Sequence, residues 1–137
     1  MIKILPSPLA LFWAAAGFTL AGCQLVRWLM AGHGVTNPGL AFSLSLPPFW
    51  IYCISGLFLI LMIWLYWVHI RWGALWAIAL GLIVGGGTSN LTDRLVLDGG
   101  AADYWHLWGI STINLADIAI TIGIVLAIWQ LVRRYGT

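Results

Sequence analysis

Four aspartates are the only acidic side chains in this sequence, and all of them fall between residues 93 and 117. They are Asp93, Asp98, Asp103 and Asp117. The chain is 62% hydrophobic and only 7% charged. Because a carboxylate near a bilayer core costs about 2.5–3.5 kcal/mol on insertion scales, a membrane chain retains one mainly where it has a task. We therefore place the working site in this window, together with the polar residues Asn90, Arg94, His106 and Asn114.

Asp103 and Asp117 are the candidates for acid–base chemistry. Asp103 follows a flexible Gly-Gly-Ala-Ala stretch, and Asp117 is expected one turn inside an apolar span. Two carboxyls brought together in a low dielectric share a proton and titrate as a pair. One then acts as a base toward water and the other as an acid toward a carbonyl, as in aspartic proteases. In the structural alternative, Asp117 caps its helix or forms an ion bridge with Arg94.

Asn90 and Arg94 are spaced to face one way on a helix. Arg94 remains charged and needs a partner near a membrane, so we expect Asp93 or a catalytic carboxylate beside it. Asp98 precedes a glycine, which predicts a solvated turn residue.

The elements that must position these residues are four apolar runs. Each approaches the 20 or so residues that cross the hydrocarbon layer. Their ranges are Leu9–Met30, Phe49–Val68, Trp72–Thr88 and Ile113–Val132. The sequence thus predicts an all-α membrane protein, a single domain over residues 1–137, with both termini on one side of the membrane.

The basic residues predict which side that is. Lys3, Arg71 and the pair Arg133–Arg134 belong to one side, against Arg27 and Arg94 on the other. The positive-inside rule then makes both termini cytoplasmic, and the loops 31–48 and 89–112 face outward. The net charge of +2 comes mostly from these anchors, and without a basic run it gives no indication of nucleic-acid binding.

Two local patterns add detail. Residues Ala41–Leu46 alternate apolar and polar like a short half-buried strand. Gly81 and Gly85–Gly87 lie at the end of the third span, where small residues allow helices to approach closely. The same glycines could instead line a substrate groove, and three in a row make the helix easy to end there.

Several blocks of the sequence resemble, in order, the signature blocks of the bacterial lipoprotein signal peptidases (signal peptidase II). They are Gly86–Arg94, Gly100–Tyr104 and Asn114–Asp117, with Asn37–Ser43 resembling the first-loop block. Gln24 and Arg27 fall where the family has Asp-Gln-x-x-Lys. The resemblance covers nearly the whole chain and identifies it as a short, divergent member.

This resemblance implies a membrane aspartic endopeptidase with Asp103 and Asp117 as its catalytic residues. It places five residues in supporting or substrate-binding positions: Asn37, Asn90, Asp93, Arg94 and Asn114. The family removes signal peptides from diacylglyceryl-prolipoproteins just before the lipidated cysteine, without metal or cofactor. The implied protein is a monomer in the bacterial cytoplasmic (inner) membrane, with its active site at the outer face and a reduced extracytoplasmic β/loop region. Its partners are lipid-modified precursors and membrane lipids.

Cys23 stands at the family's aspartate position and Arg27 at its lysine position. Leu20–Cys23 also resembles a lipobox, which we interpret as coincidence because cleavage there would remove the first span. Cys23 and Cys53 are expected to be free packing residues rather than a disulfide. The three histidines, His33, His69 and His106, show no metal-ligand spacing. We expect His106 to be an interfacial ring, although it could also tune the carboxyls.

Two other functions are compatible with the sequence. A catalytically inactive family member would only bind lipoprotein precursors, and the missing aspartate at position 23 keeps this alternative open. A small proton-coupled four-span transporter would carry its ionisable residue in mid-bilayer. The first three predicted spans hold no such carboxylate, and the acids gather at one face, which argues against a conduction path.

Overall fold

The computed structural model describes residues 6–40, 44, 46–109 and 111–136. Within these ranges, four helices are long and apolar enough to cross a membrane. They are α1 (Pro8–Leu29), α2 (Pro48–Val68), α3 (Ala74–Val96) and α4 (Leu115–Tyr135). Their arrangement confirms the predicted fold class, an all-α multi-pass membrane protein.

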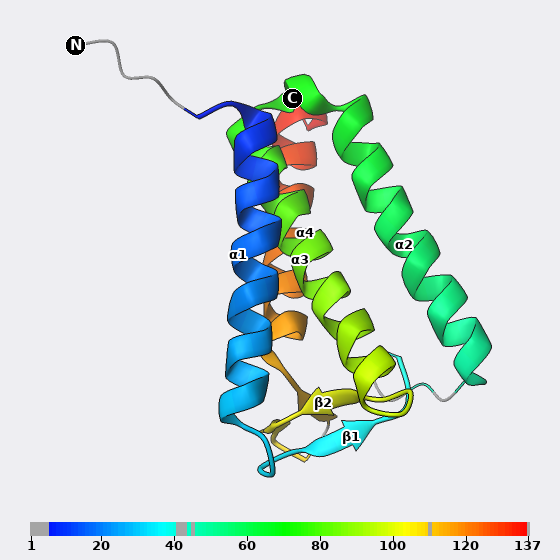
Figure 1. The fold of residues 1–137 in the computed structure, drawn as a ribbon. Helices are drawn as coiled ribbons and strands as arrows, with labels where there is room; N and C mark the ends of the chain where they lie inside the picture. Colours follow the sequence, from blue (N-terminus) through cyan, green and yellow to red (C-terminus); the bar gives the residue numbers. More distant parts are fainter. Residues whose placement is uncertain (1–5, 41–43, 45, 110, 137) are drawn as a thin grey trace.

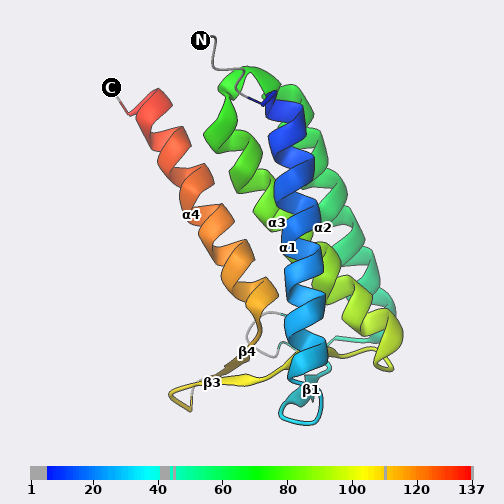
Figure 2. The same cartoon turned by 60° about the vertical axis from the view of Figure 1, so that its left-hand side comes forward.

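Helix α3 is the centre of the bundle. It packs against α1 on one side and α4 on the other, whereas α2 leans against α3 from the periphery (Figures 1 and 2). In the most apolar stretch of α3, 56% of the residues are buried inside the protein, against 11% in that of α2. Helix α1 begins, and α4 ends, at the same end of the bundle, and the strands gather at the other end (Figure 1).

The glycines of α3 are the reason that its neighbours come so close. A Cβ added at Gly85 would lie 2.5 Å from the Ala16 carbonyl oxygen of α1, and one at Gly86 would lie 2.7 Å from the Ala116 carbonyl oxygen of α4. Real Cβ atoms essentially never make such contacts with backbone. The structure therefore supports close helix packing at these glycines, as small residues provide in membranes.

Helix α3 also extends further than the sequence predicted. It begins at Ala74, after the short 3-10 helix η2 (Ile70–Trp72), and continues through the three glycines to Val96. The predicted outer loop from Ser89 is thus wrong in its first two turns. The glycines did not end the helix because packing against α1 and α4 holds them in place. Asn90, Asp93 and Arg94 are consequently helical.

Short strands close the end of the bundle that carries the acidic residues. Strand β1 (Val35–Asn37) pairs antiparallel with β2 (Ala101–Asp103), and β3 (Trp105–Leu107) pairs with β4 (Ser111–Ile113). These small pairs confirm the reduced β/loop region. The strand predicted at residues 41–46 falls mostly outside the described residues.

Candidate active site

Asp103 ends strand β2 and is only 2% exposed. Three side chains donate hydrogen bonds to its carboxyl group. Asn37 and Thr112 donate to Oδ2 at 3.0 and 3.2 Å, and Asn114 donates to Oδ1 at 3.0 Å. The donors come from β1, β4 and the residue before α4, so the two strand pairs and the fourth helix converge on this carboxyl.

Burial raises the pKa of the Asp103 carboxyl above its ordinary value. The hydrogen bond from Asn37 lowers this pKa and the nearby charge of Asp117 raises it, while Thr112 and Asn114 lower it. The net direction is upward, because removal from water penalises the charged form most. Asp103 is therefore suited to hold a proton at a pH where a solvated aspartate would have lost it.

Asp117 lies in the first turn of α4 and forms a capping box with Asn114. The Asn114 side chain accepts from the Asp117 backbone N–H at 3.0 Å, and the Asp117 carboxyl accepts from the Asn114 backbone N–H at 3.1 Å. A helix N-terminus favours negative charge because its N–H groups and dipole point at the carboxylate. The capping alternative raised from the sequence is thus present in the fold.

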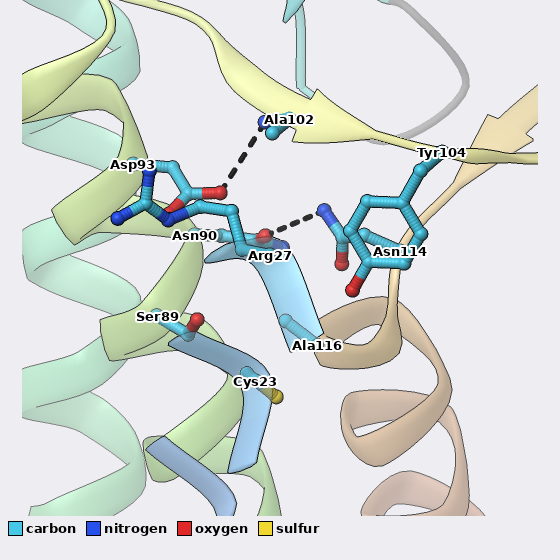
Figure 3. A pocket seen from close by; sticks show the side chains of 9 residues that line it. All are labelled: Cys23, Arg27, Ser89, Asn90, Asp93, Ala102, Tyr104, Asn114 and Ala116. Carbon is cyan, nitrogen blue, oxygen red and sulfur yellow. Dashed lines mark hydrogen bonds and ion pairs between the residues drawn. The ribbon is translucent and has the colours of Figure 1, made fainter. Parts of the chain in front are cut away.

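Two asparagine amides join the two carboxyls. Besides its bond to Asp103, the Asn114 Nδ2 donates to Asn90 Oδ1 at 2.9 Å, as Figure 3 shows. Asn90 Nδ2 in turn donates to Asp117 Oδ1 at 2.9 Å. We call this series, Asp103, Asn114, Asn90 and Asp117, the amide relay. It brings together four of the seven residues proposed from the sequence, and Asn37 adjoins it through Asp103.

Asp93 holds a different set of partners beside the relay. Its Oδ1 accepts from Gln24 Nε2 at 2.9 Å and pairs with Arg27 Nε at 3.1 Å, both from α1. Its Oδ2 accepts from the Ala102 backbone N–H at 3.3 Å (Figure 3). One carboxylate, 3% exposed, therefore links α1, α3 and the strand residue next to Asp103.

Arg94 corrects the prediction that a carboxylate would be its partner. Its guanidinium donates to two backbone carbonyls, that of Asn90 at 3.0 Å and that of Gly39 at 2.7 Å. Within the described residues the one ion pair formed by Asp93 is with Arg27 instead. Successive residues on a helix point about 100° apart, so Asp93 faces α1 while Arg94 faces the first loop. The Arg94 side chain thus anchors that loop through a backbone hydrogen bond and does not serve as the partner of a carboxylate.

Sequence reasoning missed two contributors to the site. Thr112 is the third donor to Asp103, and Tyr104 accepts a hydrogen bond from the Leu115 backbone N–H at 3.0 Å, at the start of α4. No spacing rule connects Thr112 with Asp103, because Asp103 ends β2 and Thr112 lies in β4, and these strands belong to two different pairs that meet in space. Tyr104 is part of the matched Gly100–Tyr104 block, and that was the one available indication.

The other candidates lie outside the relay. Cys23 is 3% exposed and lines a tightly filled recess with Arg27, Ser89, Asp93 and Asn114 (Figure 3). Both cysteines are free, as expected. Asp98 occupies a turn with φ of 52°, and His106 is exposed on β3. In the part of the chain that the structure describes, no group of three or more His, Cys, Asp or Glu residues is arranged to hold a metal ion.

Comparison with known proteins shows the family to which this chain belongs. A family model described as "Signal peptidase (SPase) II" matches residues 11–133. The chain belongs to the signal peptidase II family. It is therefore a member of a protease family. The residues of the amide relay come from the blocks in which the sequence resembles this family.

Individual signal peptidase II relatives support this assignment. The chain is 36% identical over 114 residues to the lipoprotein signal peptidase of Leifsonia xyli subsp. xyli, covering 79% of this chain but only 52% of that protein. It is 35% identical over 120 residues to that of Campylobacter jejuni subsp. jejuni, covering 82% and 74%. It is also 35% identical over 122 residues to the lipoprotein signal peptidase of Pseudomonas aeruginosa, covering 80% of this chain and 68% of that protein.

Solved structures support the fold. A bacterial membrane enzyme determined by the in meso method superposes with a TM-score of 0.76 at 22% identity, covering 89% of this chain and 87% of that one. A second such structure gives a TM-score of 0.74 at 21% identity, covering 88% and 91%. The four-helix arrangement with its small strands is therefore shared with enzymes of bacterial membranes.

Proposed function

We infer that this protein is an aspartic endopeptidase that removes signal peptides from diacylglyceryl-prolipoproteins, cutting before the lipidated cysteine. The amide relay is the observation that carries this conclusion. It sets two carboxyls from different elements at a fixed relation, one on a buried strand and one at a helix N-terminus. Family membership and the names of the relatives support the reaction and the substrate class.

The environments of the two carboxyls support different roles for them. Asp103 has a raised pKa because it is buried, so we assign it the acid. Asp117 sits where backbone N–H groups and the helix dipole favour an anion, so we assign it the base. A water molecule within reach of both would be the nucleophile.

The reaction then balances as follows. Asp117 takes a proton from water while the water oxygen bonds to the scissile carbonyl carbon, and Asp103 donates its proton to the carbonyl oxygen. The resulting tetrahedral diol collapses when the C–N bond breaks. Asp117 then gives its proton to the leaving nitrogen, and Asp103 recovers one from a hydroxyl group. Both carboxyls return to their starting states, and no other reactant is consumed.

The placement of the site suits a lipid-bearing substrate. The relay lies at one end of four membrane-crossing helices, at the level where a lipidated cysteine would meet water. The Lys/Arg distribution supports an outward-facing site in the bacterial inner membrane, with both termini cytoplasmic. The proposed working unit is a monomer, since the hydrogen bonds of the amide relay form within one chain.

The test is direct cleavage. Purified protein is incubated with a diacylated prolipoprotein, and mass spectrometry follows the released signal peptide. We expect cleavage only before the lipidated cysteine, and none of the precursor that lacks the lipid. Retention of the precursor without cleavage would favour the inactive, precursor-binding alternative. That alternative is considered because Cys23 stands where the family has an aspartate.

A further inference from the structure

The end of the bundle opposite the strands is positively charged without any acidic side chain to balance it. Arg71, in η2, and the pair Arg133–Arg134, in the last turn of α4, lie there. All four aspartates of the sequence lie between residues 93 and 117, toward the other end. The C-terminal carbonyls of α4 supply only about half a negative charge, so they do not neutralise two arginines.

At this end, Gln130, Arg133 and Arg134 line an open recess of about 270 Å³. They are spaced three and four residues apart, so Arg133 and Arg134 project from the turn that follows Gln130. Gln130 Nε2 donates to the Trp72 carbonyl oxygen at 3.0 Å, which ties α4 to η2. The Arg134 guanidinium lies 4.9 Å from the centre of the Trp72 ring. A cation–π contact of this kind restricts the arginine and leaves the edges of its fork available.

The surroundings of the recess are those of a membrane interface. Trp129 is 59% exposed and Tyr135 is 71% exposed, and such amphipathic rings favour the headgroup level. Ile128 and Val132, on the same helix, are also exposed, as expected for side chains that face acyl chains. They stand two residues before Gln130 and Arg134, so they point to the opposite face of α4 and do not line the recess.

We propose that this recess binds the phosphate of an anionic phospholipid from the surrounding leaflet. The two guanidinium groups supply planar donors that match phosphate oxygens, and the Gln130 amide adds a neutral donor. The position of the recess at a membrane interface favours a lipid headgroup over free phosphate, because anionic lipids are concentrated at that surface and attract juxtamembrane arginines. The site is separate from the amide relay, and the proposal holds whatever reaction the relay performs.

The experiment measures lipid retention by the intact protein. Protein reconstituted in phosphatidylcholine bilayers with a graded fraction of phosphatidylglycerol is released into detergent, and native mass spectrometry counts the bound phospholipids. Arg134→Gln removes a charge that lines the recess. Arg71→Gln is the matched control, because it removes the same charge from the same end without touching the recess. Thermal unfolding of each variant establishes that it is folded.

We expect the wild-type protein to retain phosphatidylglycerol over phosphatidylcholine. Each recess arginine removed should weaken retention roughly five-fold, as expected for one cation at a lipid surface. Arg71→Gln should change it less than two-fold in the same assay, and Arg134→Lys should fall between Arg134→Gln and wild type. Inorganic phosphate at millimolar concentration should not displace the lipid.

Three results would overturn the proposal. Equal weakening by Arg71→Gln and Arg134→Gln would mean that diffuse surface charge attracts the lipid. Equal retention of the two phospholipids would exclude a phosphate-selective site for anionic lipid. Displacement by inorganic phosphate alone would assign the recess to free phosphate.

Discussion

Asp103 and Asp117 differ in what holds them, and burial raises the pKa of the Asp103 carboxyl. Asp103 is enclosed by two strand pairs, whereas Asp117 is also part of the cap of α4. A change at either residue therefore affects a hydrogen-bond network as well as the proposed chemistry. Asparagine is the most informative substitution, because it keeps the shape of the side chain and removes its acid–base chemistry while disturbing few hydrogen bonds.

Asp103→Asn and Asp117→Asn are each expected to lower the rate of signal-peptide release by about 10²-fold or more, because an amide neither takes nor gives the required proton. An amide at 103 faces donors on both sides, so that variant should also lose about 1 kcal/mol of unfolding free energy from one hydrogen bond. Asp98→Asn, in its turn outside the relay, is the control and should cleave like wild type. An equal loss from Asp98→Asn would show that the wrong carboxyl had been assigned.

Thr112→Val tests whether Asp103 is the acid. Removing the Thr112 hydroxyl takes away a hydrogen bond that lowers the pKa of Asp103, so this pKa should rise further. If Asp103 must be protonated, the alkaline limb of the kcat/KM profile should move to higher pH. A profile that keeps its limbs while the rate falls would instead make Thr112 a purely structural residue.

The raised pKa of Asp103 also makes the stability of the folded protein depend on pH. The folded protein binds this proton more tightly than the unfolded chain, so the stabilisation is full below the ordinary aspartate value and is lost as the pH rises through the folded-state pKa. Thermal unfolding of wild type and Asp103→Asn across that window checks it. The wild-type protein should gain in unfolding temperature relative to the variant as the pH falls.

At the scale of elements, Asp93 couples helix α1 to strand β2 and so positions Asp103 without touching it. Asp93→Asn should break the pair with Arg27 and loosen the Ala102 contact, lowering unfolding free energy by roughly 1–3 kcal/mol. We expect kcat to fall more than KM rises, because the misplaced group acts in the chemical step. Arg27→Lys keeps the charge and should retain most activity, whereas Arg27→Gln should resemble Asp93→Asn. Full activity in Asp93→Asn would remove this positioning role.

Helix packing gives a second prediction at this scale. Gly85→Ala should cost about 1–3 kcal/mol of stability, because the new methyl group meets the Ala16 carbonyl of α1 and forces the helices apart. Gly22→Ala is the control, since nothing lies within 4 Å of a Cβ added there. Unfolding in detergent measures both variants. Equal stability of the two would contradict close packing between α1 and α3.

The sequence predicted the helices and the local cap well, but not the contacts between segments far apart in the chain. Hydropathy located the four spans because apolar length is a property of single segments. It missed the last two turns of α3, since Asn90–Arg94 lower the hydropathy while their backbone hydrogen bonds continue. The capping pair Asn114–Asp117 was readable from local spacing, but the contacts of Thr112 and Arg94 depend on strands and loops meeting in space. The peripheral position of α2 also had no local indication.

For the whole molecule, orientation in the membrane is the decisive prediction. Reporter fusions after His69 and at Thr137 should report cytoplasm, and fusions within 32–39 or 99–104 should report the outer face, because of the Lys/Arg asymmetry. The activities of paired cytoplasmic and periplasmic reporters measure this. A C-terminus on the outer side would place the carboxyls toward the cytoplasm and contradict the proposed substrate.

The direction of the hydrogen bonds in the amide relay has a further consequence. Both Asn114 and Asn90 use Nδ2 to donate toward a carboxyl, and amide nitrogens neither gain nor release protons under conditions in which proteins fold. The relay is therefore a rigid spacer but a proton insulator: it fixes where the two acids stand and conducts nothing between them. A proton that changes sides during a cycle has to travel through the substrate or a water molecule. The entry of fresh water after product leaves would then supply only the next nucleophile, because each carboxyl has already recovered its starting state through the substrate.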